Sequence, residues 1–153
     1  MKNMRRKDRE ISEQVARELL MAAEYGILAT VDQKGQPYGV PLSFVYKGDA
    51  IYFHSATTGH KLENIAANPR VSFSIVGKTK VLPEQFSTEY ESAIAFGTAG
   101  EVHGEGRTQA LVWLLEKYSP EQIEEGRKYI EKLDNSTTVI KVVVSHVSGK
   151  ARR

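Results

Sequence analysis

The sequence predicts a mainly β protein, in which an antiparallel barrel or sandwich is flanked by helices. About six short β-compatible segments are joined mostly by turns, and no regular crossover helix separates them as it would in a parallel sheet. Helical patterns occur once before these segments, once briefly among them and twice late in the chain. Strands joined in this way favour antiparallel pairing.

Composition bounds the class of protein. The 153 residues are expected to form one domain, 1–153, because no linker or repeat divides them. Hydrophobic content of 41% and charged content of 26% are typical of a globular chain, and the apolar runs are too short to span a membrane. With no cysteine, disulfides and thiolate catalysis are excluded. A net charge of +2 gives no reason to expect a nucleic-acid partner.

The two ends are basic. Residues 1–10 and 148–153 are interpreted as solvated N-terminal and C-terminal tails, because charge runs of this kind usually face water. No apolar signal core follows the basic N-terminus, so we expect a cytoplasmic protein.

The first helix is predicted to begin at Ser12, a good N-cap, and to stop at Gly26. Its apolar side chains recur every four residues, at Ile11, Val15, Leu19 and Ala23. Strands are then expected at 27–31, 36–46 and 50–55. The second of these contains Pro37 and Pro41, and proline cannot donate a ladder hydrogen bond. We therefore expect this strand to lie at an edge or to be interrupted.

The second half is predicted to hold a short helix at 61–67, strands at 71–75, 92–102 and 137–147, and helices at 108–118 and 121–133. Residues 77–90 show the least regular pattern. The strand at 92–102 is rich in small residues, namely Ala93, Ala95, Gly97, Ala99 and Gly100. So many small side chains indicate close approach of another surface, either a ligand or a second subunit.

Residues 54–61 carry the strongest candidate chemistry. The segment holds two imidazoles, three hydroxyls and one ammonium group, from His54, His60, Ser55, Thr57, Thr58 and Lys61. Gly59 comes just before the predicted helix start. Hydrogen-bond donors, positive charge and a helix N-terminus together predict an anion site, such as one for phosphate. The alternative is an ordinary polar connection with a solvated Lys61.

Other site chemistries are not indicated. No nucleophile elbow, Walker A loop or dinucleotide fingerprint occurs in the sequence. His54 and His60 lack an acidic third ligand nearby, so we expect no metal site. His54 and Ser55 are adjacent on a strand and should point to opposite faces, which argues against a hydrolytic pair.

Three segments resemble a known family. They are ILATVDQKGQPYGVPLSFVY at 27–46, IYFHSATTGHKLENIAANPRVSFSI at 51–75 and YESAIAFGTAGEV at 90–102. Together they resemble the FMN-binding split-barrel proteins, in the pyridoxamine 5'-phosphate oxidase-like branch that includes nitroimidazole-resistance proteins. The resemblance covers about residues 9–150. It implies a six-stranded antiparallel Greek-key split barrel, and a homodimer that binds two FMN molecules at the subunit interface.

The resemblance also implies a set of site residues. Lys61 and His60 would bind the FMN phosphate, and the segment 40–43 would lie along the isoalloxazine ring. His54 would be the candidate catalytic residue, contacting substrate or donating a proton, although it can also be read as a structural histidine. Trp113 would reach the partner's flavin, or else belong to the core. The full cofactor-binding set is Val40, Pro41, Leu42, Ser43, His54, Ser55, Ala56, Thr57, Gly59, His60, Lys61, Phe96 and Trp113.

The implied function is an FMN-dependent oxidoreductase that reduces small oxidised or nitroaromatic compounds, with a reduced nicotinamide as a possible electron donor. Alternatives are a non-enzymatic flavin-binding or sensor protein, and a barrel that uses a deazaflavin or haem instead. Oxidases of pyridoxine phosphates carry Ser-Arg-Lys in the phosphate clamp, whereas this chain has Gly59-His60-Lys61. That departure leaves phosphate affinity and the identity of the cofactor open. The chain also lacks an arginine-rich substrate clamp for pyridoxine phosphate, which disfavours that oxidase activity.

Overall fold

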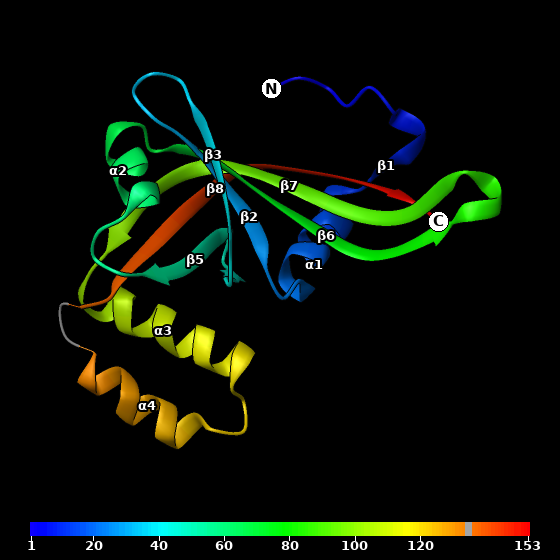
Figure 1. Cartoon of the computed structure of the whole chain (residues 1–153). Helices are drawn as coiled ribbons and strands as arrows, with labels where there is room; N and C mark the ends of the chain where they lie inside the picture. The colour runs from blue at the N-terminus through cyan, green and yellow to red at the C-terminus, as the bar shows by residue number, and fades with distance from the viewer. Residues whose placement is uncertain (134–135) are drawn as a thin grey trace.

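The computed structural model describes residues 1–133 and 136–153, and within them eight strands form one antiparallel sheet. The strand order is β3-β2-β6-β7-β8-β5-β4, and β1 also pairs with β8 (Figure 1). The strands are β1 (Glu10–Ile11), β2 (Gly26–Val31), β3 (Pro37–Leu42), β4 (Val45–Lys47), β5 (Ala50–Ser55), β6 (Arg70–Leu82), β7 (Ser87–Val102) and β8 (Thr138–Arg152). The helices are α1 (Glu13–Ala22), α2 (His60–Ala67), α3 (Gly104–Tyr118) and α4 (Ile123–Lys132), with short 3-10 turns at Lys7–Arg9 and Pro83–Gln85.

The mainly β class is confirmed, and the expected strand at 36–46 is divided in two. β3 and β4 lie at opposite ends of the strand order, yet only Ser43 and Phe44 connect them. Three Cα–Cα steps span at most about 11 Å, so the sheet must curl until its two ends come together. Among the described strands β3 and β4 do not pair with each other, which makes the barrel an open, split one.

The edge position predicted from the prolines is confirmed. β3 is the terminal strand of the sheet, and its only neighbour among the described strands is β2. Pro41 lies opposite Ile27 in that pairing. A strand with one free edge tolerates proline, because the missing donor costs no ladder hydrogen bond on that side.

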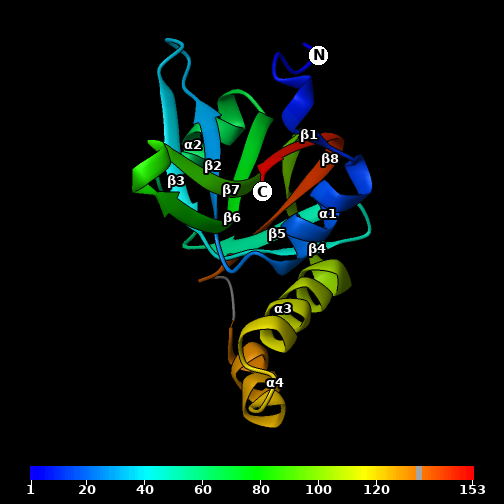
Figure 2. The same ribbon diagram turned by 90° about the vertical axis from the view of Figure 1, so that its right-hand side faces the viewer.

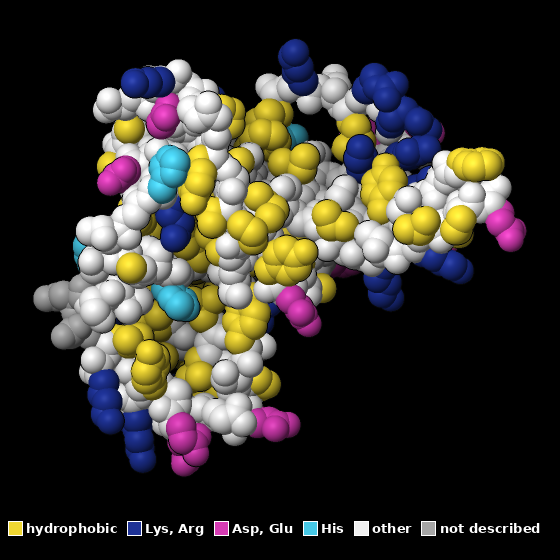
Figure 3. All heavy atoms as spheres, in the orientation of Figure 1, with side chains coloured by type: hydrophobic (Ala, Val, Ile, Leu, Met, Phe, Trp, Pro, Cys, Tyr) yellow, Lys and Arg dark blue, Asp and Glu magenta, His cyan; other side chains and the backbone are white. Residues whose placement is uncertain are grey.

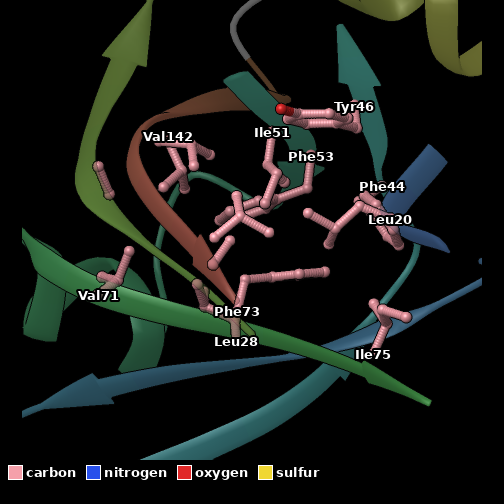
Figure 4. Packing of buried hydrophobic residues seen from close by; sticks show 14 of the residues in the cluster. Leu20, Leu28, Phe44, Tyr46, Ile51, Phe53, Val71, Phe73, Ile75 and Val142 are labelled. Atoms are coloured by element: carbon pink, nitrogen blue, oxygen red, sulfur yellow. The ribbon is translucent and has the colours of Figure 1, made fainter. Parts of the chain in front are cut away.

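The main core lies inside the curled sheet and is closed on one side by α1. Its largest fully buried side chains include Leu20, Leu28, Phe44, Phe53 and Phe73 (Figure 4). Ser12 caps α1 as predicted, since its Oγ accepts a hydrogen bond from the Val15 N–H at 3.2 Å. This helix brings its apolar stripe against the sheet, with Ala16 and Leu20 fully buried.

Gly26 does not end α1, which stops at Ala22. Gly26 is instead the first residue of β2, and a Cβ there would lie 2.2 Å from Cε1 of Phe73. Its small size is therefore a packing requirement of the core rather than a helix stop.

Residues 77–90 were the least regular in the sequence, but the structure makes them a β-hairpin arm. β6 continues to Leu82 and β7 begins at Ser87, so the two strands pair well beyond the barrel (Figure 1). The arm carries exposed apolar side chains, including Val81 and Phe86. Backbone hydrogen bonds between β6 and β7 form the arm, although its sequence does not alternate between apolar and polar residues.

The interpretation of 148–153 as a solvated tail is wrong for most of its length. β8 runs to Arg152, and Lys150 lies between Glu10 of β1 and Ser92 of β7. Backbone pairing on both sides holds this basic segment in the sheet. The N-terminal tail is also shorter than expected, because Lys7–Arg9 form a 3-10 turn and Glu10 opens β1.

Most of the small residues of β7 face the protein's own interior, whereas Gly100 is exposed. Ala93, Ala95 and Ala99 are buried in the main core. A Cβ at Gly97 would lie 2.3 Å from the backbone oxygen of Val143, where the β7–β8 register shifts. The surface that approaches these residues closely is the protein's own interior and its own neighbouring strand.

The pair α3 and α4 lies at one end of the barrel (Figure 2). α3 begins at Gly104, four residues earlier than predicted, and α4 is shorter than the expected range 121–133. Ala110, Leu111 and Leu114 of α3 pack against β4, β5 and β8 in a second apolar cluster. This packing places α3 beside the end of β5, where the candidate site begins.

A buried polar pair joins α2 to the sheet and gives a first prediction. The Asn64 side-chain amide donates a hydrogen bond to the Thr30 hydroxyl at 3.0 Å, and both residues are buried. Thr30→Val should lower the free energy of unfolding by about 1–3 kcal/mol, because the buried amide loses its acceptor. Urea unfolding measures this, with Thr98→Val at an exposed position of β7 as the control. Equal losses in the two variants would contradict the role of this pair.

Candidate functional site

The start of α2 is shaped to receive an anion. Gly59 is its N-cap residue, with a φ of 149° that side-chain-bearing residues rarely adopt. Among the described residues no side chain caps this helix end. The first N–H groups of a helix have no partner within the helix, so they remain available to a ligand. A Cβ at Gly59 would meet nothing within 4 Å, so the backbone conformation rather than crowding favours glycine at this position.

His60 and Lys61 flank this helix start from different sides. The His60 ring stacks on Tyr38 of β3, with ring centroids 4.0 Å apart and an interplanar angle of 23°. Lys61 is partly buried, and its charge acts on His54. The structure therefore joins the end of β5, the start of α2 and the edge strand β3 around one location, as the anion site requires.

The surroundings of His54 lower its pKa, which favours the neutral imidazole. His54 is the residue before Ser55, which ends β5, and it lies opposite Val139 of β8. Although the side chain reaches solvent, the surrounding protein displaces water from the imidazole and lowers its pKa, and the positive charge of Lys61 lowers it further. A neutral imidazole offers one donor and one acceptor nitrogen, which suits hydrogen bonding or proton transfer to a ligand.

A cavity of about 440 Å³ lies beside His54, between the barrel and the α3–α4 pair. Figure 3 shows a histidine among apolar side chains where the helices meet the barrel. Ser43, His54 and Tyr118 provide polar groups in its wall, and the apolar lining includes Leu111, Leu114, Leu115, Ile130 and Leu133. A mostly apolar cavity of this size with few polar groups is typical of a small-molecule site.

The predicted ring-binding segment 40–43 divides into two kinds of residue. Val40 and Leu42 pack against the main core, so their side chains are directed inward. Pro41 and Ser43 are exposed, and Ser43 lines the same cavity as His54. Because the outer edge of β3 has no partner among the described strands, its backbone groups are available to a ligand.

The remaining loop residues lie near the helix start, whereas two predicted residues lie elsewhere. Ser55, Ala56 and Thr57 precede Gly59 directly, and the Ser55 hydroxyl donates a hydrogen bond to the Ala56 carbonyl at 2.8 Å. The ring of Trp113 packs on Tyr52 with centroids 5.4 Å apart, as the core alternative predicts.

Phe96 lies apart from His54 within one chain. It pairs with His146 on β8, whereas His54 pairs with Val139, seven residues away along that strand. At roughly 3.3 Å per residue, this separation is about 23 Å along the strand. Within one chain, Phe96 is therefore distant from His54.

Sequence reasoning missed three residues that build the site. Tyr38 supports the His60 ring, and Lys117 and Tyr118 bind the backbone of Phe44 in the link between β3 and β4. These contacts join segments that are far apart in the sequence. The only local signal was a Lys-Tyr pair at the polar end of an apolar helix.

An open antiparallel barrel of this kind defines the split-barrel class, and an uncapped helix start lies beside its edge strand. The comparison with protein families agrees. Residues 12–151 match the family model described as pyridoxamine 5'-phosphate oxidase, so the chain belongs to that family. No curated protein matches the chain.

Solved structures share the fold. A protein from Bacteroides thetaiotaomicron proposed to confer 5-nitroimidazole antibiotic resistance is 25% identical, with a TM-score of 0.76 over 93% of this chain and 86% of that one. An FAD-binding protein from Mesorhizobium loti is 23% identical, with a TM-score of 0.68 over 95% and 98%. An FAD- and haem-binding protein from Mycobacterium smegmatis is 22% identical, with a TM-score of 0.76 over 93% and 72%.

Within residues 1–133 and 136–153, no group of three His, Asp or Glu side chains is placed to hold a metal ion. No helix in the described part of the chain has the length and apolar character needed to cross a membrane.

Proposed function

We propose that this protein is an FMN-binding flavoprotein that reduces small oxidised or nitroaromatic compounds. The observation that carries the proposal is the uncapped start of α2, where Gly59 and Lys61 offer backbone N–H groups and a positive charge beside the His54 cavity. Membership of the pyridoxamine 5'-phosphate oxidase family supports a flavin phosphate as the anion. The resistance role proposed for the Bacteroides thetaiotaomicron protein supports nitroaromatic substrates.

The residues fit this cofactor by the chemistry of their donors. The N-terminal N–H groups of α2 and the Lys61 ammonium would bind the phosphate, as helix starts and lysines do elsewhere. The backbone of 40–43 at the free edge of β3 would hydrogen-bond the polar rim of the ring. When bound, the flavin supplies the two-electron chemistry that no side chain here can perform. Neutral His54 would give its ring N–H proton to a substrate in the apolar cavity while its other ring nitrogen takes a proton from water, so that the imidazole stays neutral.

We also propose a homodimer. Ile94 and Val143 are exposed apolar side chains on neighbouring strands β7 and β8, and Phe96 lies two residues from Ile94 on the same strand. A second copy would cover this apolar surface and bring a Phe96 side chain to a site that one chain leaves incomplete. A reduced nicotinamide, the proposed electron donor, would reach the flavin only transiently, since the chain has no dinucleotide-binding motif.

The test is direct. Purified protein is mixed with FMN, and the flavin retained after gel filtration is identified by chromatography and its absorption spectrum. The bound flavin is then mixed anaerobically with NADPH or NADH, and a nitroimidazole is added as oxidant. Flavin bleaching followed by recovery of its colour is the expected result. Failure to bind FMN would overturn the proposal.

Two other outcomes favour the alternatives. FMN that binds but is never reduced by either nicotinamide would support a flavin-binding or sensor protein without turnover. Retention of FAD or haem in preference to FMN would support the chemistry named for the mycobacterial and Mesorhizobium loti proteins. Retention of a deazaflavin would support the remaining alternative.

A further inference from the structure

Phe44, in the two-residue link between β3 and β4, has its backbone bound by side chains from the end of α3. Its N–H donates to the Tyr118 hydroxyl oxygen at 3.0 Å. Its carbonyl accepts from the Lys117 ammonium at 2.8 Å and lies 2.9 Å from the Tyr118 hydroxyl. In a continuous strand both groups would bond to a neighbouring strand. Here two side chains of α3 replace that strand.

The same two side chains also hold the connection between α1 and β2. The Lys117 ammonium donates to the Ala23 carbonyl at 2.6 Å, and the Tyr118 hydroxyl is within hydrogen-bond distance of the Glu24 carbonyl. We name Lys117 and Tyr118 the α3 latch. They fasten α3 to two segments that are distant from it in the chain.

The link is held from its other side by the core. The Phe44 ring is fully buried and packs edge-on against Phe73, with centroids 4.6 Å apart. The Lys117 ammonium also lies 4.0 Å from the Phe44 ring centroid, where the electron-rich ring face attracts a cation. Both the backbone and the side chain of Phe44 are therefore fixed.

Fixing Phe44 sets the direction of the residue before it. The peptide bond between Ser43 and Phe44 is planar and trans, so its C=O and N–H lie in one plane and point in opposite directions. With the Phe44 N–H directed at Tyr118, the Ser43 carbonyl is directed away from Tyr118. Ser43 lines the cavity together with His54 and Tyr118. The latch thus controls how the end of the ring-binding segment is presented at the cavity.

We infer that Lys117 and Tyr118 are positioning residues for the flavin ring, acting through the Ser43–Phe44 peptide. The inference rests on the proposed function, because it assigns the ring to this segment. Burial lowers the pKa of Lys117 to about 8, although nearby Glu24 opposes the shift. The ammonium form therefore predominates at neutral pH, where it can serve two carbonyls and the Phe44 ring at once.

The test separates the ring end of the ligand from its phosphate end. Lys117→Met and Tyr118→Phe keep most of each side chain and remove the latch atoms. Both variants should bind FMN and riboflavin more weakly by the same factor, about tenfold, since riboflavin has the ring without the phosphate. The absorption bands of the remaining bound flavin should shift, because the polar edge of the ring meets a differently oriented backbone. Lys128→Met, exposed on α4, is the matched control for Lys117→Met, and Tyr25→Phe, at an exposed tyrosine outside the cavity, is the matched control for Tyr118→Phe.

The outcomes are distinct. If wild-type protein binds neither FMN nor riboflavin, the proposed function itself fails. If wild-type protein binds and both latch variants match it in affinity and absorption, the positioning role is overturned.

If the variants do not fold, hydrogen exchange in the wild-type, cofactor-free protein still tests the inference. The Phe44 amide should exchange its hydrogen at least 100-fold more slowly than an unstructured amide, because the latch is formed before the flavin binds. Exchange at the unstructured rate would overturn the inference.

Discussion

Lys61→Met is expected to weaken FMN binding about 10- to 150-fold while leaving riboflavin binding within about twofold. Hydrogen bonds to charged groups contribute about 1.5–3 kcal/mol, and each 1.4 kcal/mol is a factor of ten in affinity. Methionine retains the apolar stem of this partly buried side chain and removes only the charged donor. Titration of the apoprotein with each flavin, followed by fluorescence, measures both constants.

The matched control is Lys34→Met, which removes an exposed lysine in the turn between β2 and β3. It should leave both affinities unchanged. Equal weakening of FMN and riboflavin by Lys61→Met would remove Lys61 from the phosphate end of the ligand.

The same substitution should also raise the pKa of His54 in the cofactor-free protein. The Lys61 charge holds this pKa down, although displacement of water from the ring is the larger cause. Because the lowered pKa favours the neutral ring, its rise means that protonation begins at a higher pH in the variant. An NMR titration of the imidazole checks this shift without any bound flavin. An unchanged His54 pKa would contradict the proximity of the two side chains.

Gly97→Ala is expected to destabilise the fold by about 3 kcal/mol. Overpacking a well-packed position costs about 1–3 kcal/mol, and a clash with backbone is at the upper end because a strand cannot move aside like a flexible side chain. A Cβ at Gly97 would lie 2.3 Å from the Val143 carbonyl oxygen, at the register shift between β7 and β8. Urea unfolding measures the loss.

Gly100→Ala is the natural control on the same strand, since a Cβ there meets nothing within 4 Å. Its cost should stay below about 1 kcal/mol, which is the scale of an ordinary exposed substitution in a strand. Similar losses at the two positions would show that chain entropy, rather than the close approach of β8, explains the glycine at 97.

Local chemistry made part of the candidate site predictable. The start of α2, with Gly59 before His60 and Lys61, is encoded within a few residues, because helix caps and turns depend on adjacent backbone. The stacking of Tyr38 on His60 and the hold of Lys117 on Phe44 were not predictable. Those contacts depend on how separate elements pack, and the spacing of residues within one segment does not predict that packing.

The errors in strand length have a similar cause. Residues 77–90 pair as an arm although most of their side chains are exposed, and residues 148–152 pair although they are basic and small. Side-chain alternation indicates a strand only where one face is buried. Backbone hydrogen bonds to a neighbouring strand stabilise these segments instead, and they depend on register.

The sequence alone was enough to establish the mainly β class, the edge position of the proline-containing strand and the helix start after Gly59, where an anion site is predicted. Each depends on short-range pattern or on the stereochemistry of single residues. Only the tertiary structure decided that the small residues of β7 face the core, that β3 and β4 form the two ends of one curled sheet, and that α3 fastens the link between them. These features arise from contacts between segments that are distant in the sequence and meet only when the sheet curls around the core.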